Sequence, residues 1–213
     1  DVENIFVHLA SQIRLPRLNL ALLAPFQLHR KLIEKIDVLG EAAARGLDAR
    51  IVLKMNALTD EQLMLSLVRA GRHGAKIDLI VRGACMLPAR VPGVTDNIRV
   101  RSIIGRFLEH SRVFYFRAGH EEELYLSSAD WMNRNMLRRI ELAWPVNDPA
   151  LRQRIIDECL VAYLHDDRDA WDLLPDGTYK RVKGAGEPAG HGAQAALMTR
   201  HAARAEAEEP AWT

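Results

Sequence analysis

The sequence predicts an α/β fold in which a mixed sheet is flanked by helices. Short apolar runs, RIVLKM at 50–55 and KIDLIV at 76–81, are typical of buried strands. Stretches with helical periodicity at 25–45 and 60–72 precede these two runs. Because helices and strands alternate at short spacing, we expect these strands to pair in parallel through right-handed crossovers.

The first half of the chain carries clear start and stop signals. Pro25 opens the helix at 25–45 and Gly46 ends it, while Asp60 caps the helix at 60–72. The expected elements here are a short amphipathic helix at 1–12, a strand at 18–24, the helix at 25–45, a strand at 50–55, the helix at 60–72 and a strand at 76–81.

The second half is richer in expected strands. Prolines and a glycine mark 84–97 as a loop, and Asp148 caps a helix that begins with Pro149. The expected elements are strands at 97–103, 108–116, 124–128 and 137–146, a helix at 149–164, a small hairpin turn at 176–177, and a tail from 183 in which 194–207 forms a helix when docked.

Composition limits the class of protein. The 213 residues, 48% of them hydrophobic, are enough for one sizeable core with appendages, and a net charge of +1 argues against a general polyanion binder. Cys85 and Cys159 lack metal-ligand spacing, so we expect reduced thiols in a cytosolic protein. A signal peptide, a lipidation motif and a long apolar span are absent from the sequence, and the start at Asp1 is typical of a fragment.

The expected strand at 108–116 is apolar and aromatic except at His110, Ser111 and Arg112. Because strand side chains alternate, His110 and Arg112 are expected on the same face, where an unpaired charge would be expensive to bury. An imidazole beside a guanidinium can hold a phosphoryl group, which the Arg binds as a fork. The alternative is a core histidine bonded to a carbonyl or to Glu109.

The surrounding sequence is unusually rich in arginine. Residues 82–139 contain ten Arg, no Lys and six Asp or Glu, a local net charge of +4. Exclusive use of Arg favours bidentate phosphate recognition, although a solvated basic face or an Arg-favouring genome would give the same count.

Polar residues follow several of the strands. Lys54 and Asn56, Arg82, and the region 127–139 can converge at one edge of the sheet, where ligands of parallel α/β sheets collect. A histidine with several cations and no nearby acid pair suits phosphoryl chemistry. P-loop and Rossmann fingerprints are absent from the sequence, and the spacing supports no metal site.

Each candidate has a structural alternative. Arg82 could simply pair with Asp78, and Lys54 could cap the carboxyl end of a helix. Asp130, Asn133 and Asn135 are typical of a turn and a helix start rather than of catalytic groups.

Five stretches resemble the carboxyl-terminal part of bacterial polyphosphate kinase, over residues 1 to about 182. They are KMNALTD at 54–60, LIVRG at 79–83, IRVRSIIGRFLEHSR at 98–112, SADWMNRN at 128–135 and RRIEL at 138–142. The resemblance implies a phospholipase-D-like pair of α/β domains with the catalytic centre between them. Residues 1–14 would end the first domain, 15–182 would form the second, and 183–213 would be a flexible tail, partly disordered or helical.

The resemblance also implies a reaction, the reversible transfer of the terminal phosphoryl group of ATP to polyphosphate. Arg82 and His110 would contact the nucleotide phosphates, and Arg139 would be a third contact, with Arg138 on the solvent side. Arg112 would replace the Lys of a His-x-Lys motif, and Lys54 and Asn56 complete the expected phosphate-binding set. His110 would be the catalytic group of this chain, as a hydrogen-bond donor, acid or base.

The accepting histidine and the Mg²⁺ site of that family belong to the first domain, so no metal ligand is expected here and the isolated fragment should be inactive. The implied partners are ATP or ADP, polyphosphate, the missing part of the same protein and further copies of it, without specific nucleic acid. The expected location is cytoplasmic, with membrane association as an alternative.

Two other functions stay open at this point. A phospholipase-D-like phosphodiesterase would need two His-x-Lys motifs, or one in a homodimer, and this chain has a single His-Ser-Arg. A non-catalytic polyanion-binding module would bind through its arginines with strong salt dependence and no preference for ATP.

Overall fold

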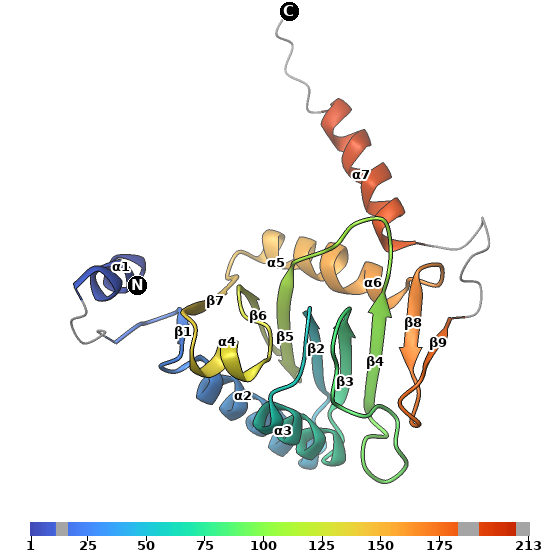
Figure 1. Ribbon diagram of the computed structural model, residues 1–213, viewed down its shortest axis with the longest axis horizontal. Helices are drawn as coiled ribbons and strands as arrows, with labels where there is room; N and C mark the ends of the chain where they lie inside the picture. The colour runs from blue at the N-terminus through green and yellow to red at the C-terminus, as the bar shows by residue number, and fades with distance from the viewer. Residues whose placement is uncertain (12–16, 183–191, 208–213) are drawn as a thin grey trace, which may run out of the picture.

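A computed structural model of the chain describes residues 1–11, 17–182 and 192–207 (Figure 1). The strands of this part are β1 (Leu22–Ala24), β2 (Ala49–Met55), β3 (Lys76–Val81), β4 (Ile98–Ile103), β5 (Arg112–Ala118), β6 (Glu121–Ser127), β7 (Glu141–Pro145), β8 (Ala170–Leu173) and β9 (Tyr179–Arg181). The helices are α1 (Val2–Ser11), α2 (Leu28–Ala44), α3 (Glu61–Arg72), α4 (Asn133–Leu137), α5 (Pro149–Ile155), the π-helix η1 (Ile156–Val161), α6 (Ala162–Leu164) and α7 (Ala193–Ala207).

The strands form one mixed sheet of 9 strands in the order β1-β7-β6-β5-β2-β3-β4-β8-β9. The expected parallel pairing is confirmed for β2 with β3 and for β3 with β4, while β5 runs antiparallel to both β2 and β6. The carboxyl ends of β2, β3, β4 and β6 therefore lie at the same edge as the amino ends of β5 and β7. We call this edge the rim; it is built from the segments 54–58, 82–84, 104–112 and 127–132.

Helices cover both faces of the sheet (Figure 1). On one face, residues of α2 and α3 pack against Ile51 and Leu53 of β2, and on the other Leu160 and Tyr163 pack against Val52. The alternation along β2 follows from strand geometry, in which successive side chains point to opposite faces. The rim is thus held by a sheet that is buried on both sides.

The strand that carries Arg112 is shorter than expected. β5 begins at Arg112, which pairs with Ser127, the last residue of β6, and Val113 pairs with Lys54 of β2. The residues just before Arg112 pair with no neighbouring strand in the part that the structure describes, so His110 lies in a loop. The prediction that His110 lies within the strand was therefore wrong.

Other expected boundaries also differ. The helix expected at 25–45 begins at Leu28, after a turn that contains Pro25, and the strand expected at 124–128 begins at Glu121. The first strand covers only Leu22–Ala24 of the expected 18–24, and residues 137–146 divide into the end of α4 and the strand β7. The helix expected at 149–164 is continuous but passes through the π-helical turn η1.

The hairpin turn expected at 176–177 joins β8 and β9, with Gly177 at a φ of 83° that favours glycine. The helix expected at 194–207 is present as α7. The rest of the expected tail, 183–191 and 208–213, lies outside the described residues. Cys85 and Cys159 are both free thiols. Within the described ranges, none of the helices combines the length and the apolar character that crossing a membrane requires.

Two leucines of α3 give a matched test of this packing. Leu67 is fully buried under the sheet, whereas Leu65 is 50% exposed. We expect Leu67→Ala to lower the free energy of unfolding by about 2–5 kcal/mol, because it leaves a cavity, and Leu65→Ala to lower it by less than about 1 kcal/mol. Urea unfolding followed by circular dichroism measures both, and equal losses in the two variants would contradict the assigned face of α3.

Candidate functional site

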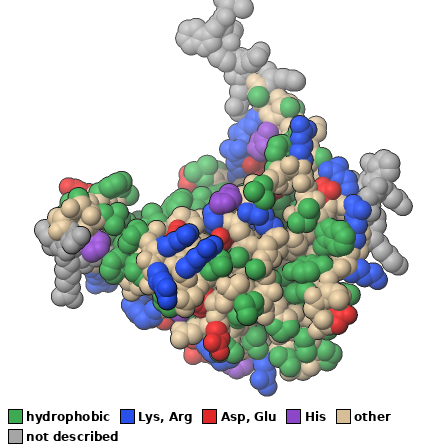
Figure 2. Space-filling model, viewed as in Figure 1, with side chains coloured by type: hydrophobic (Ala, Val, Ile, Leu, Met, Phe, Trp, Pro, Cys, Tyr) green, Lys and Arg blue, Asp and Glu red, His purple; other side chains and the backbone are tan. Residues whose placement is uncertain are grey.

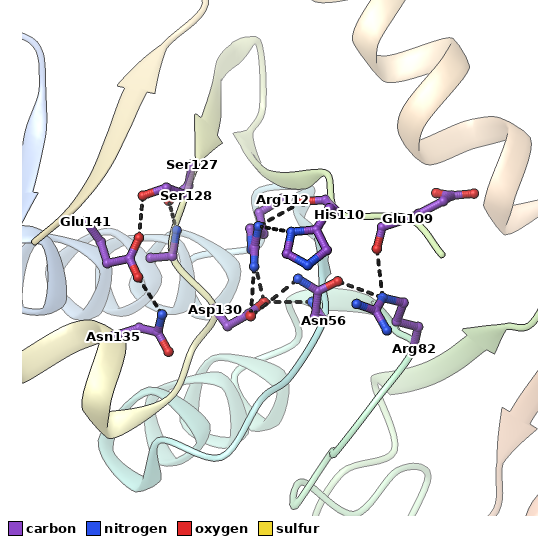
Figure 3. A network of polar contacts seen from close by, with 11 residues as sticks. Asn56, Arg82, Glu109, His110, Arg112, Ser127, Ser128, Asp130, Asn135 and Glu141 are labelled. Atoms are coloured by element: carbon purple, nitrogen blue, oxygen red, sulfur yellow. Dashed lines mark hydrogen bonds and ion pairs between the residues drawn. The ribbon is translucent and has the colours of Figure 1, made fainter. Parts of the chain in front are cut away.

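A buried carboxylate joins two strands at the rim (Figure 3). Asp130, just beyond the end of β6, accepts hydrogen bonds at Oδ1 from the Asn56 backbone N (2.8 Å) and from Arg112 Nε (3.2 Å). Its Oδ2 accepts from Arg112 Nη2 (3.0 Å) and from Asn56 Nδ2 (3.3 Å). Asp130 therefore ties the end of β2 to the start of β5.

The environment of Asp130 keeps it ionised. Burial by itself would raise the pKa of this carboxyl, but the guanidinium of Arg112 and the backbone N–H of Asn56 outweigh burial and hold the pKa below its usual value of 3.8. The cationic cluster therefore contains an ionised acid, at a position that the sequence indicated only as a turn or a helix start.

Arg112, which Asp130 holds, in turn holds the side chain and the backbone of His110. Its Nη1 donates to His110 Nδ1 (3.0 Å) and to the His110 carbonyl (2.9 Å). Because a guanidinium has donors and no acceptor, Nδ1 must accept, and the neutral imidazole must carry its proton on Nε2. His110 is exposed, so the ring presents an N–H donor outward while Arg112 fixes it from behind.

Arg82 enters the same network from β3. Its Nε donates to Asn56 Oδ1 (2.7 Å) and to the carbonyl of Glu109 (2.7 Å), as Figure 3 shows. No hydrogen bond joins its two Nη nitrogens to any residue that the structure describes. The alternative pairing with Asp78 is not found, since Asp78 forms ion pairs with Arg50 and Arg99 instead.

Lys54 lies beneath this layer and is only 5% exposed. Its Nζ is 2.5 Å from Glu109 Oε2 and 3.3 Å from the centroid of the Tyr163 ring. Burial lowers the pKa of Lys54 in spite of the opposing effect of Glu109. Burial, and then the Glu109 carboxylate, raise the pKa of Tyr163. Lys54 therefore faces a carboxylate and an aromatic ring rather than the outer surface.

The space behind the rim is small. Its volume is about 20 Å³, enough for a single water molecule. It is lined by residues of β2, β3, the 104–111 loop and α6, among them Lys54, Asn56, Arg82, Phe107, Glu109 and Tyr163. A larger anion would have to approach from outside, where Arg82 and His110 lie.

Arg139 lies outside this network. It follows α4 and is exposed, as is Arg138, and neither side chain forms an ion pair with another residue in the described part of the chain. Figure 2 shows Lys and Arg side chains gathered over α4. The nearby carboxylate of Glu141 accepts from Ser128 and Asn135, as Figure 3 also shows.

The structure thus brings together Asn56, Arg82, His110 and Arg112, with Lys54 one layer below. Sequence reasoning missed Asp130 as the hub and Glu109 as the partner of Lys54. Two signals were available in the sequence. Asp130 is an acidic residue shortly after an expected strand, and the acidic residue Glu109 directly precedes His110.

A Mg²⁺ site does not fit the described residues. None of the His, Cys, Asp and Glu side chains in that part form a group of three suited to a metal ion. The two rim carboxylates are already engaged, Asp130 by Arg112 and Glu109 by Lys54, whereas Mg²⁺ prefers free carboxylate, carbonyl and water oxygens.

Fold and site together define an α/β domain whose sheet edge carries a preorganised cluster of cationic and hydrogen-bond-donating groups. The family model described as "Polyphosphate kinase C-terminal domain 2" matches residues 21–194. The chain belongs to this family.

Curated relatives agree with the family. A polyphosphate kinase of Paraburkholderia phytofirmans is 49% identical over 181 residues, covering 85% of this chain and 26% of that protein. One of Pseudomonas aeruginosa is 45% identical over 203 residues, covering 95% of this chain and 29% of that protein. The chain therefore spans about a quarter of the length of these relatives.

Solved structures also match the chain. The polyphosphate kinase of Porphyromonas gingivalis superposes with a TM-score of 0.88 at 36% identity, over 97% of this chain and 32% of that one. A phospholipase D family member from Salmonella typhimurium is matched with a TM-score of 0.47 at 14% identity, over 64% of this chain and 88% of that one. The match to the Porphyromonas gingivalis structure confirms the expected mixed α/β fold.

The Asp130 hub makes a pH-dependent contribution to stability. Its pKa is lowered in the folded state, so the contribution is complete above about pH 5 and is lost as pH falls through the lowered pKa. We expect Asp130→Asn to lower the free energy of unfolding by about 2 kcal/mol at neutral pH, and the gap between the two proteins to close below about pH 4.

The surface pair Arg117–Asp48 provides the control, because both of its side chains are at least 36% exposed. Asp48→Asn should cost less than about 1 kcal/mol at any pH. Urea unfolding between pH 3 and 7 measures both variants. A gap for Asp130→Asn that widens on acidification would show that the hub is not an ionised acceptor.

Proposed function

We propose that this chain is the part of a polyphosphate kinase that binds the phosphate groups of ATP, ADP and polyphosphate, and that it does so at the rim. Family membership supports the type of enzyme, and the geometry of the rim supports the type of ligand. The activity is proposed for the longer protein, because this chain covers only about a quarter of its relatives.

One observation carries the proposal. Arg82 and His110 each have one edge held by the protein and the other edge without a partner among the described residues. The outward edge of Arg82 is a pair of Nη donors, and that of His110 is the Nε2 proton. Donors that are fixed before the ligand arrives need no reorganisation as negative charge develops, which makes them effective in phosphoryl transfer.

The residues then divide by role. Arg82 would bind two phosphate oxygens as a fork, and His110 would donate from Nε2 to an oxygen of the moving phosphoryl group. Arg112 and Asn56 would hold these two groups, since their own polar atoms are largely engaged by Asp130. Lys54 would add positive charge from below. Arg139, exposed and unpaired within the described part, would contact a more distant phosphate of the chain.

The other requirements of the reaction fall to the rest of the longer protein. It would supply the group that accepts the phosphoryl and the Mg²⁺ site, for which the described residues offer no fit. We also propose that the longer protein is a homo-oligomer. The isolated chain would bind phosphates without turnover, because the rim supplies charge and position and lacks an accepting group.

Charge-matched arginine variants test the proposal. We expect this chain to bind tripolyphosphate and ADP, and Arg82→Ala and His110→Ala each to weaken tripolyphosphate about 10-fold, the size of one charge-assisted hydrogen bond. Isothermal titration calorimetry measures the dissociation constants. Arg72→Ala is the control, since Arg72 ends α3 at the opposite edge of the sheet and is exposed.

The outcomes separate the alternatives. Equal weakening in all three variants, with single-stranded nucleic acid bound as tightly as tripolyphosphate, would indicate a non-specific polyanion-binding module. Release of nitrophenol from a chromogenic phosphodiester by the isolated chain would indicate a phosphodiesterase. Unchanged affinity in both rim variants would refute the proposed site.

A further inference from the structure

The segment 104–111, which we call the His110 loop, joins β4 to β5 and carries His110. It has little apolar anchorage, because Ile104, Phe107 and Leu108 are 59%, 49% and 77% exposed. It also forms no regular ladder with the sheet. Since hydrophobic burial cannot fix this loop, polar contacts must set the position of His110.

Gln194, in the first turn of α7, holds the middle of this loop. Its Oε1 accepts from the Phe107 backbone N (2.8 Å), and its Nε2 donates to the Phe107 carbonyl (2.9 Å). The side-chain amide thus pairs with one residue in both directions, like the hydrogen-bonded pair of an antiparallel ladder. Gln194 is 5% exposed, so this amide would be costly to bury without these partners.

Gln194 also reaches the residue next to His110. Its Nε2 donates to Glu109 Oε1 (2.7 Å), which also accepts from the Tyr163 hydroxyl, while Glu109 Oε2 accepts from Lys54. The carbonyl of the same Glu109 accepts from Arg82 Nε. Glu109 therefore connects the contact from α7 to both proposed phosphate-binding residues.

The amino end of α7 is itself anchored. Ala193 is fully buried, and its N–H donates to Asp166 Oδ2 (2.7 Å). The opposite side of the Gln194 amide is closed by Gly105: a Cβ placed there would lie 2.4 Å from Gln194 Oε1. Helix and loop therefore meet with no spare room for a methyl group.

We propose that Gln194 is a positioning residue for His110, acting from the carboxyl-terminal helix through Phe107 and Glu109. This inference rests on the proposed function, in that a phosphate contact by His110 gives the positioning its purpose. It assigns a role in the phosphate site to a segment of the chain that the resemblance treats as a tail.

Hydrogen exchange and histidine NMR of this chain test the role of Gln194 without a ligand. Gln194→Met keeps the length of the side chain and removes the amide. We expect amide exchange at Phe107 to rise about 10-fold or more, since its N–H donates to Gln194 Oε1. The ring signals of His110 should shift or broaden, and tripolyphosphate should bind about 5-fold more weakly. Exchange in β2 and β3 should stay as in the parent chain.

Thr199→Ala is the matched control on α7. Thr199 is exposed, and its hydroxyl bonds only to the Ala195 carbonyl among described residues, so the loop and His110 should not respond. Gly105→Ala approaches the same contact from the loop side. Its φ lies outside the left-handed region, and the added methyl meets the flexible end of Gln194. It should reproduce the effects of Gln194→Met, and the double variant should add little to either change.

These experiments distinguish a failure of the positioning role of Gln194 from a failure of the proposed phosphate site. Parent-like exchange and His110 signals in both Gln194→Met and Gly105→Ala would overturn the positioning role, whatever the arginine variants do. A changed loop in these variants, together with unchanged phosphate affinity in His110→Ala, would keep the role of Gln194 in holding the loop, but would overturn its purpose and the proposed phosphate site. Global loss of exchange protection in both variants would also refute the positioning role, because the contact would then support the whole domain.

Discussion

The ion pair between Arg112 and Asp130 is the constraint on which the candidate site depends. Asp130 accepts from the backbone of Asn56 as well as from Arg112, so one carboxylate sets the spacing between the end of β2 and the start of β5. The outer end of the same guanidinium fixes the ring of His110. A partly buried ion pair adds little net stability over an apolar pair, but it is expensive to break from one side. Such a pair favours one arrangement of the rim over others.

Different forces hold the sheet and the rim. The sheet is positioned by apolar packing on both faces, with Leu53 fully buried on one face and Val113 on the other. The His110 loop buries little and is positioned by Gln194 and Glu109. Polar positioning is directional, so it can aim a donor, and it leaves the loop surface open to a ligand or to the rest of a longer protein. The buried Lys54–Glu109 pair fits this division, because its partners are enclosed and Lys54 faces away from the outer surface.

Much of this fold follows from local sequence patterns. The parallel centre could be predicted because 50–55 and 76–81 are short, largely apolar runs, each after a stretch with helical periodicity. The convergence of Asn56 and Arg82 followed from their positions just beyond those strands. The loop conformation of His110 could not be predicted, because strand length is decided by where the neighbouring strands end. The roles of Asp130, Glu109 and Gln194 are contacts between residues 18 to 87 positions apart, and no periodicity in the sequence encodes them. Membership of the family was visible from the motifs, and comparison with known proteins confirmed it.

The central claim is that His110 presents a protonated Nε2 outward, fixed by Arg112 at Nδ1. Long-range nitrogen–proton NMR correlation spectra of the imidazole report which ring nitrogen carries the proton, at a pH where the ring is neutral. We expect a protonated Nε2 and a bare Nδ1 in the free chain, and a shift of the Nε2 signal when tripolyphosphate is added. A proton on Nδ1, or an Nε2 signal that does not move at saturating tripolyphosphate, would contradict the proposed role of the rim.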